Sequence, residues 1–369
     1  MGALGVAACS VLLIPAPVVA SPGMIRFGYA GCQACHLSPQ GRGLLTEYGK
    51  GIDDTQSARR GVYTTDESRQ RRLFHDVRVM AQVGTRSELH ADAVTSVDAR
   101  LWYRSAVALT ESMRVSGMVS LDVPARDVAP TGIHALPSPP QIFVRQALWE
   151  LTPRKGLYLA IGRDTLPSGV EIADQAAYMR AWNGQGITEV PTQVKLYVST
   201  PRFQVTPYLF GPSGHEAQGF HTAGAGVLAE TYLLGDRLAA GVSTRLARNA
   251  AHDIGLAGAY ARIGLGRWVV LTEHDVTRRT GRARDGHSFD QYTGFAQVLF
   301  YATDWLVVSL SGDRLAVEAP AHERRFRWRP EVSARISPHL TIAASVGTQR
   351  VSGQHSTTAL VQLFLKTVS

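Results

Sequence analysis

The sequence predicts an all-β protein, whose main part is a transmembrane antiparallel β-barrel of about 16 strands, within a range of roughly 14–18. Three observations predict it. From about Leu73 onward, apolar and polar residues alternate with a period of two, as they do in strands with one apolar face. Short and long connections alternate between these segments. After the first 20 residues there is no run of 18 or more apolar residues, which excludes a helical membrane bundle.

The composition excludes several other classes of protein. The chain has 369 residues, of which 45% are hydrophobic and 18% charged, and this balance argues against disorder. Three cysteines cannot form a disulfide framework. The net charge is +8, but no Lys/Arg cluster accompanies a nucleic-acid-binding motif, so no nucleic-acid partner is expected. A basic pore or an acidic partner explains the charge better.

Residues 1–20 are expected to form a signal peptide. Val11–Ile14 lie at the centre of an uncharged apolar stretch, and Val18–Ala20 fit a small-x-small cleavage site before Ser21. The stretch lacks a basic n-region. Two alternatives remain: a lipoprotein box at Val6–Cys9, which precedes the apolar core instead of following it, and a buried N-terminal helix. The prediction is an exported chain that starts near Ser21.

One motif after the cleavage site carries chemistry. Cys32-Gln33-Ala34-Cys35-His36 has the C-x-x-C-H spacing by which two thiols bind the vinyl groups of one porphyrin, while the histidine ligates the iron. A zinc site would need further ligands at similar spacing, and no other cysteine follows residue 20. A thioredoxin-like pair would need a βαβ context. Chance occurrence is the remaining alternative. The motif therefore predicts one covalently attached haem c on Cys32, Cys35 and His36, with His36 as the proximal iron ligand.

Residues 21–72 form the predicted haem-binding segment, and residues 73–369 the barrel. Within the segment, Gly41–Gly49 indicate a turn followed by one short helix. About fifty residues bury too little surface to be robust alone, so the rest of the chain is expected to cover part of the porphyrin.

The second iron ligand is less evident from the sequence. Met80 projects inward on the first predicted strand and His75 lies near the end of that strand, so these two residues are the candidates for the distal ligand. Met24, which lies close upstream of the motif, and Met118, inward on the third strand, are further methionines to consider, and an open site is an alternative.

The barrel prediction rests on where the connections fall. Tight turns are expected at Glu111, 153–155, Pro201, 235–236, 264–266, Asp304 and 337–339. Longer polar connections are expected at 85–97, 122–140, 164–191, 211–219, 247–254, 277–289, 313–325 and 349–356. Such an alternation is typical of outer-membrane barrels, whose closure pairs every backbone group in lipid. The connection 164–191 either folds inward or forms an external loop.

A barrel of this size leaves a lumen wide enough for water. Its expected inward residues are rich in arginine: Arg78, Arg100, Arg104, Arg114, Arg237, Arg245, Arg325, Arg327, Arg329 and Arg335. These arginines are what the wall of an anion-favouring porin would carry. Alternatively, some of them pair with haem propionates or with a docked acidic electron carrier. Seven histidines fall in predicted long connections, as polar loops in general would show: His90, His134, His215, His252, His287, His322 and His355.

An exported C-x-x-C-H motif followed by one porin-like barrel resembles the fused monohaem c-type cytochrome–porin family of the bacterial outer membrane, which includes iron-oxidising cytochromes. Only Cys32, Cys35 and His36 match as a motif; the Pro and Leu-Asn that family members tend to carry are approximated by Pro39 and Leu44-Leu45. The resemblance implies an outer-membrane location, in contact with its lipid, with both termini periplasmic or the haem segment in the lumen. It also implies that the protein passes electrons between an extracellular donor or acceptor, Fe(II) or another metal, and periplasmic c-type cytochromes.

Two other functions stay open. One is an anion-leaning diffusion porin with a structural or sensory haem segment, and the other is a plain barrel with a chance motif. No G-x-S-x-G, H-E-x-x-H or P-loop occurs after residue 20. Any turnover would therefore be one-electron oxidoreduction at the haem, of the Fe(II)-oxidase or metal-reductase kind.

Overall fold

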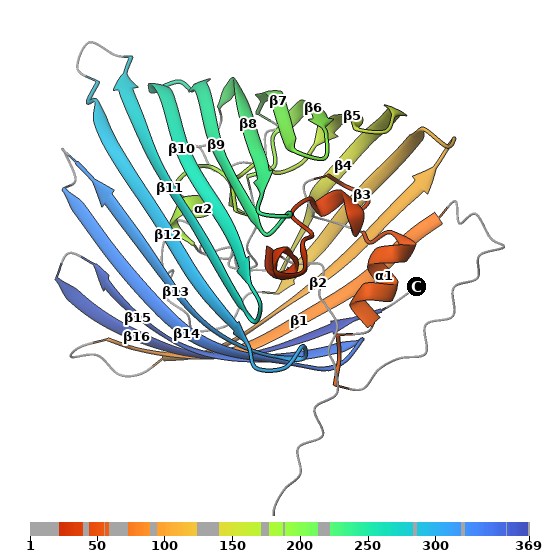
Figure 1. Cartoon of the computed structure of the whole chain (residues 1–369). Coiled ribbons are helices and arrows are strands. Elements are labelled where there is room, and N and C mark those ends of the chain that lie inside the picture. Colours follow the sequence, from red (N-terminus) through yellow and green to blue (C-terminus); the bar gives the residue numbers. More distant parts are fainter. Residues whose placement is uncertain are drawn as a thin grey trace, which may run out of the picture.

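The computed structural model describes residues 22–39, 44–54, 56–58, 73–88, 94–123, 140–170, 177–186, 189–212, 222–282, 286–318, 322–351 and 353–367. Sixteen antiparallel strands form one closed barrel in which each strand pairs with its neighbours in sequence, and β1 closes on β16 (Figure 1). Closure leaves no open edge, so the backbone groups of every strand find partners in the sheet. The predicted fold class is confirmed.

The strands have the following bounds. They are β1 Leu73–Glu88, β2 Val94–Ala108, β3 Met113–Val123, β4 Gln141–Arg154, β5 Leu157–Arg163, β6 Thr192–Ser199, β7 Phe203–Gly211, β8 Ala223–Leu233, β9 Leu238–Arg248, β10 His252–Leu265, β11 Trp268–Gly281, β12 Phe289–Tyr301, β13 Leu306–Val317, β14 Glu323–Ser337, β15 Leu340–Val351 and β16 Gln354–Lys366.

The two faces of the barrel wall follow the alternation in the sequence. On β14, Phe326 and Trp328 lie on the outer face and are 51% and 46% exposed. Arg325 and Arg327 alternate with them and face the lumen, where Arg327 pairs with Asp313 of β13 at 2.6 Å. An apolar outer face and a polar inner face are what a barrel in lipid requires.

The connections separate by length, as predicted, into two ends of the barrel. At one end, called the turn end, each pair of strands is joined by two to four residues: 109–112, 155–156, 200–202, 234–237, 266–267, 302–305 and 338–339. The opposite end, called the loop end, carries the longer connections. Six of these are shorter than predicted, because the strands continue further, and two of the six are as short as the turns: β9 and β10 are joined by 249–251, and β15 and β16 by 352–353. Arg237 lies exposed in a turn and not, as predicted, on the inner face.

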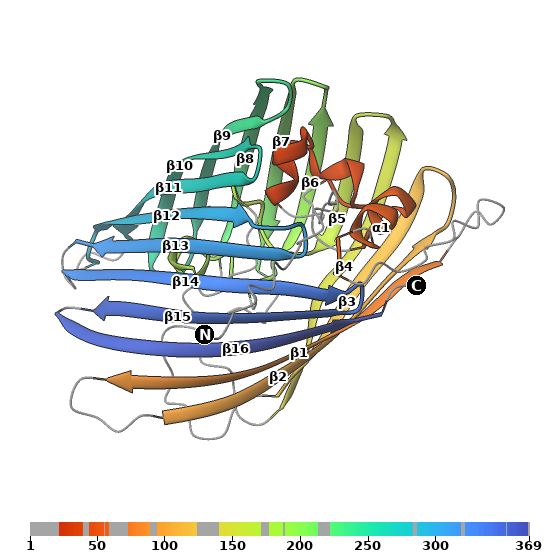
Figure 2. The same cartoon turned by 60° about the horizontal axis from the view of Figure 1, so that its bottom comes forward.

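The N-terminal segment lies inside the barrel at the turn end (Figure 2). It contains two short 3-10 helices, η1 Pro22–Phe27 and η2 Cys32–Ala34, and one α-helix, α1 Glu47–Asp54. The helix α1 begins within the stretch Gly41–Gly49, where the sequence predicts a turn and a short helix; residues 41–43 of the predicted turn lie outside the described residues. None of the helices in the described part of the chain is long and apolar enough to cross a membrane.

The connection between β5 and β6 folds into the lumen, which settles the alternative that the sequence left open. It carries the short helix α2 Tyr178–Ala181, which contacts β11, β12 and β13. The carboxylate of Glu273 on β11 accepts hydrogen bonds from the backbone N–H groups of Gly169 and Val170, at 3.2 and 2.6 Å. Ile25 of η1 and Met179 of α2 belong to one apolar cluster, so the segment and this inward loop meet inside the barrel.

Candidate functional site

The C-x-x-C-H motif forms one tight turn in the N-terminal segment. The backbone N–H groups of Cys35 and His36 both donate to the carbonyl oxygen of Cys32, at 3.2 and 3.0 Å. Neither cysteine is part of a disulfide. His36 then pairs with Leu45 in an isolated β-bridge. The turn therefore holds the two thiols and the imidazole on a short, hydrogen-bonded piece of backbone, which is what attachment of one porphyrin requires.

The helix α1 is fastened directly to this turn. The N–H of Thr46 donates to the carbonyl oxygen of Cys35 at 2.9 Å, and its hydroxyl donates to the carbonyl oxygen of Ala34 at 3.3 Å. The same hydroxyl accepts from the N–H of Gly49 at 3.0 Å, and so caps the helix. A Cβ on Gly49 would lie 2.0 Å from the carbonyl oxygen of Cys35. A glycine is needed here because helix and motif touch backbone to backbone.

Cys35 lies in a small apolar cluster with Met24, Tyr29 and Ile52. Burial, together with the nearby Cys32 thiol and Asp53 carboxylate, raises the pKa of the Cys35 thiol above its ordinary value. On the exposed side of the cluster, Tyr29 and Tyr48 share a short hydrogen bond between their hydroxyls, and this bond, with burial and the nearby Tyr29 and Cys35, raises the pKa of Tyr48 to about 12. The second cysteine of the motif is thus shielded from water by residues of its own segment.

Ion pairs fasten the segment to the barrel wall on two sides. Arg26 of η1 pairs with Asp304 in the turn between β12 and β13 at 2.9 Å, and both side chains are buried. Asp53 of α1 pairs with Arg335 of β14 at 2.7 Å and with Lys366 of β16. Burial alone would raise the pKa of Asp53, but the two cations outweigh it and hold that pKa below its ordinary value.

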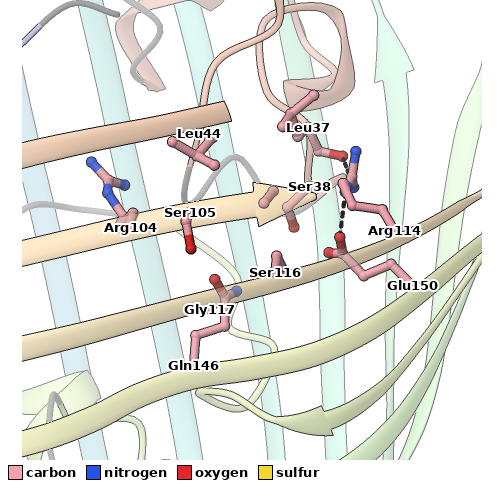
Figure 3. Close-up of a pocket in the computed structure, with 11 residues that line it drawn as sticks. Leu37, Ser38, Leu44, Arg104, Ser105, Arg114, Ser116, Gly117, Gln146 and Glu150 are labelled. Atoms are coloured by element: carbon pink, nitrogen blue, oxygen red, sulfur yellow. Dashed lines mark hydrogen bonds and ion pairs between the residues drawn. The ribbon is translucent and has the colours of Figure 1, made fainter. Parts of the chain in front are cut away.

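The motif itself contacts the opposite walls of the lumen. On one side, the guanidinium of Arg262 on β10 lies 3.9 Å from the sulfur of Cys32 and pairs with Glu230 of β8 at 2.5 Å. On the other side, the guanidinium of Arg114 on β3 donates to the carbonyl oxygen of Leu37 at 3.0 Å and pairs with Glu150 of β4 (Figure 3). The C-x-x-C-H turn therefore bridges the barrel interior.

A pocket of about 300 Å³ that opens to solvent lies beside the end of the motif. It is lined by Leu37 and Leu44 of the segment and by residues of β2, β3 and β4, among them Arg104 and Gln146 (Figure 3). Arg104 is 7% exposed and pairs with Asp76 at 2.8 Å, but its Nη2 atom has no hydrogen-bond partner among the described residues. The pocket thus combines apolar side chains with a buried guanidinium that can donate a further hydrogen bond to an anionic ligand.

The predicted distal ligands lie on different faces of β1. Met80 is buried on the inner face and pairs in register with Arg100 and Phe364 of the neighbouring strands. His75 is exposed and shares the outer face with Leu73 and Val77, so the structure does not bring it toward the segment inside the lumen. No observation tests either ligand, and both stay predictions. The methionine that the structure brings to the motif is Met24.

Several contacts at this site were not predicted from the sequence. In the sequence, Met24 is a candidate only because it lies close to the motif. The roles of Asp53, Arg262 and Glu230 leave no signal there, since each depends on how the segment docks in the barrel. The inward arginines were found from the period-two alternation, but not which of them touch the motif. Among the described residues, no group of three or more His, Cys, Asp or Glu side chains gathers as a metal site.

No protein-family model and no curated protein matches this sequence. Solved structures with the same fold do. An anion-selective porin from Comamonas acidovorans superposes with a TM-score of 0.61 at 11% identity, covering 80% of this chain and 99% of that one. OmpT, an outer membrane protein of Vibrio cholerae, gives a TM-score of 0.60 at 9% identity, with coverages of 81% and 99%. Pseudomonas putida OprB gives 0.59 at 10%, with coverages of 80% and 94%. These similarities show that the chain has the fold of a 16-stranded outer-membrane porin.

Proposed function

We propose that this protein is an outer-membrane cytochrome–porin that moves electrons between an extracellular donor or acceptor and periplasmic c-type cytochromes. One observation carries the proposal: the only described cysteines form a C-x-x-C-H turn that is fixed inside a porin-like barrel. A single haem c, bound to Cys32 and Cys35 with His36 on the iron, would supply a one-electron redox centre there.

The residues around the turn fit such a group. Cys35 is buried with Met24, Tyr29 and Ile52, which keep water from one side of the attachment point. Leu37, Leu44 and Ala106 offer apolar walls in the adjoining pocket. The open Nη2 atom of Arg104 can donate to a carboxylate, and a haem carries two propionates that need such donors. Residues of the segment therefore supply attachment and shielding, and the wall supplies the cation.

The barrel isolates the site from lipid while leaving each end in a different compartment. In outer-membrane barrels the short turns face the periplasm, so the turn end and the N-terminal segment belong on that side. The hydrocarbon core is about 30 Å thick. A redox centre near one edge therefore needs a donor or acceptor that enters the lumen from the loop end, such as Fe(II) or another metal, and a carrier at the turn end. In the oxidising direction, the donor loses one electron and the periplasmic cytochrome gains it.

The rim of the turn end suits an acidic carrier. Five exposed cations lie in or beside four turns that follow one another around the barrel, and one exposed carboxylate, that of Asp236, lies among them. The cations are Arg154, Lys155, Arg202, Arg237 and Arg267. None of them forms an ion pair with another described residue. Across the rim, Glu111 is exposed and Asp304 is held by Arg26. This basic arc borders β8 and β10, where Cys32 lies, so an acidic protein would be drawn to the side nearest the motif.

A second function, an anion-leaning diffusion porin with a structural or sensory haem segment, is favoured by one specific observation. Arg325 and Arg327 of β14 stand over the rings of Trp182 and Tyr178 from the inward loop, at 5.1 and 5.6 Å. Cations on the wall of a lumen favour the passage of anions. Each of these arginines also pairs with a carboxylate, Arg325 with Glu323 at 2.5 Å and Arg327 with Asp313 at 2.6 Å, which partly neutralises them.

A liposome experiment separates the two functions. The protein is reconstituted into liposomes that enclose a soluble c-type cytochrome, and Fe(II) or an anionic Fe(II) chelate is added outside. Electron conduction predicts that the enclosed cytochrome is reduced by the wild type and not by the Cys32→Ala/Cys35→Ala variant. Equal rates for both proteins would overturn the electron-transfer function. An ionic conductance equal for both proteins, without reduction, would support the porin.

A further inference from the structure

A second pocket lies inside the barrel, away from the haem motif and toward the loop end. It is formed between the inward loop and the lumen wall, with Asn183 and Gly184 on the loop side and Arg245 of β9 and Arg279 of β11 on the wall. It encloses about 390 Å³ of space, part of which is continuous with solvent. Two arginines on one wall of a pocket are a characteristic arrangement for binding an anion.

Arg245 is a buried cation whose guanidinium touches no carboxylate of the described residues. It is 6% exposed, and its Nη2 atom donates to the backbone carbonyl oxygen of Asn183 at 2.5 Å. It forms no ion pair within the part of the chain that the structure describes, and its Nε atom has no hydrogen-bond partner there. A buried charge is costly unless a counter-charge compensates it. Asp275 of β11 attracts Arg245 electrostatically but does not reach ion-pair distance, so no counter-charge touches this guanidinium in the described residues.

Arg279 repeats the arrangement one loop residue away. Its Nη2 atom donates to the carbonyl oxygen of Trp182 at 3.2 Å, and its guanidinium lies 5.9 Å from the ring of Phe289. It likewise forms no ion pair among the described residues. Each arginine thus donates one hydrogen bond to a neutral carbonyl of the inward loop. The other N–H groups of the two guanidiniums can donate to a ligand in the pocket.

Two acidic groups lie nearby, and neither forms an ion pair with Arg245 or Arg279. Asp275 accepts a hydrogen bond from the side-chain amide of Asn183 at 2.9 Å, outside ion-pair distance of Arg245. Glu189 lies on the pocket lining, but its carboxylate interacts electrostatically with Arg145 of β4. Two cations, Arg245 and Arg279, therefore face a pocket whose lining holds one carboxylate, that of Glu189.

We propose that this pocket is a binding site for a small oxyanion, a phosphate or a carboxylate, held by the guanidiniums of Arg245 and Arg279. The bound anion neutralises the two buried charges and joins the inward loop to the wall, because both arginines also hold carbonyls of that loop. The site does not depend on the haem segment, since none of its lining residues belongs to it.

The test measures inorganic phosphate binding to the purified full-length protein in detergent, by isothermal titration calorimetry in a chloride-free buffer. Loss of one arginine should weaken binding at least about tenfold, because each guanidinium donates charge-assisted hydrogen bonds to the anion. The variants are Arg245→Gln and Arg279→Gln, and the control is Arg350→Gln, an exposed cation of β15. The control should bind as the wild type does.

Three results would overturn the site: no binding to the wild type, an unchanged affinity in Arg279→Gln, or an equal loss in the control. Because Arg245→Gln removes a contact with the inward loop, folding of this variant is first checked by heat-modifiable gel mobility. If this variant does not fold, Arg279→Gln alone tests the proposal. The Cys32→Ala/Cys35→Ala variant should bind phosphate as the wild type does. Colourless wild-type protein that still binds phosphate refutes the proposed function alone.

Discussion

Gly49 decides whether α1 can lie against the C-x-x-C-H motif. Because a Cβ at this position would meet the carbonyl oxygen of Cys35 at 2.0 Å, Gly49→Ala must push the helix away. Overpacking of this kind costs about 1–3 kcal/mol. We expect trypsin to cut after Lys50 at least about fivefold faster in the variant, and haem content to fall. Gly51 of the same helix has open space around it. Gly51→Ala should therefore slow cleavage after Lys50 slightly, because alanine favours a helix more than glycine does. Equal cleavage of the two variants would refute the packing argument.

Met24 is the methionine that the structure brings to the motif, where it packs with Cys35. A methionine on haem iron raises the reduction potential, so its loss lowers that potential. We predict that Met24→Leu lowers the midpoint potential in a redox titration and alters the haem absorption spectrum, whereas Met80→Leu leaves both unchanged. The opposite pattern would assign the ligand to Met80, as the sequence suggested, and His75→Ala tests the third candidate in the same way.

At the scale of elements, α1 stays docked through Asp53, which is buried between Arg335 and Lys366. The folded state holds the pKa of Asp53 below its ordinary value. The stabilisation of α1 docking by the Asp53 carboxylate is therefore complete above about pH 4, and it is lost as the pH falls through the lower, folded-state pKa. Asp53→Asn leaves two cations unpaired, and should cost about 3 kcal/mol of docking at neutral pH.

Hydrogen exchange of residues 47–54, followed by mass spectrometry and corrected for intrinsic rates, measures this docking. The wild type should be protected from neutral pH down to about pH 4 and lose protection only below it. Asp53→Asn should exchange fast throughout, with little dependence on pH. Protection of the variant equal to that of the wild type would show that the ion pairs do not hold α1.

The elements differ in how far the sequence could predict them. Strands were predictable because lipid imposes a period of two on each of them, and Phe326 and Trp328 alternate with arginines for that reason. The tight turns were predictable from their glycines, prolines and charges. The inward course of the β5–β6 loop was not, since it depends on Glu273 accepting from Gly169 and Val170, which lie more than a hundred residues away. The site residues Cys32, Cys35 and His36 could be named because their spacing is local.

For the whole molecule, the basic arc at the turn end predicts how carriers dock. An acidic soluble cytochrome should take electrons from the wild type faster at low ionic strength, with a rate that falls as salt screens the charges. Arg202→Glu/Arg237→Glu should slow this transfer about tenfold or more. The control is Arg324→Glu/Arg350→Glu, which changes the same charge on the outer face near the loop end. If the two variants behave alike in stopped-flow absorbance, the arc is not the docking site.

The whole account depends on one haem being covalently attached to this barrel. The most direct measurement is a pyridine haemochrome spectrum, together with the intact mass, of the full chain purified from the outer membrane of a host with working cytochrome c maturation. We predict one haem c per chain in the wild type. In Cys32→Ala/Cys35→Ala we predict none, with a heat-modifiable barrel still present. Wild-type protein that reaches the outer membrane as a folded barrel and is colourless, with the mass of the bare polypeptide, would contradict the account.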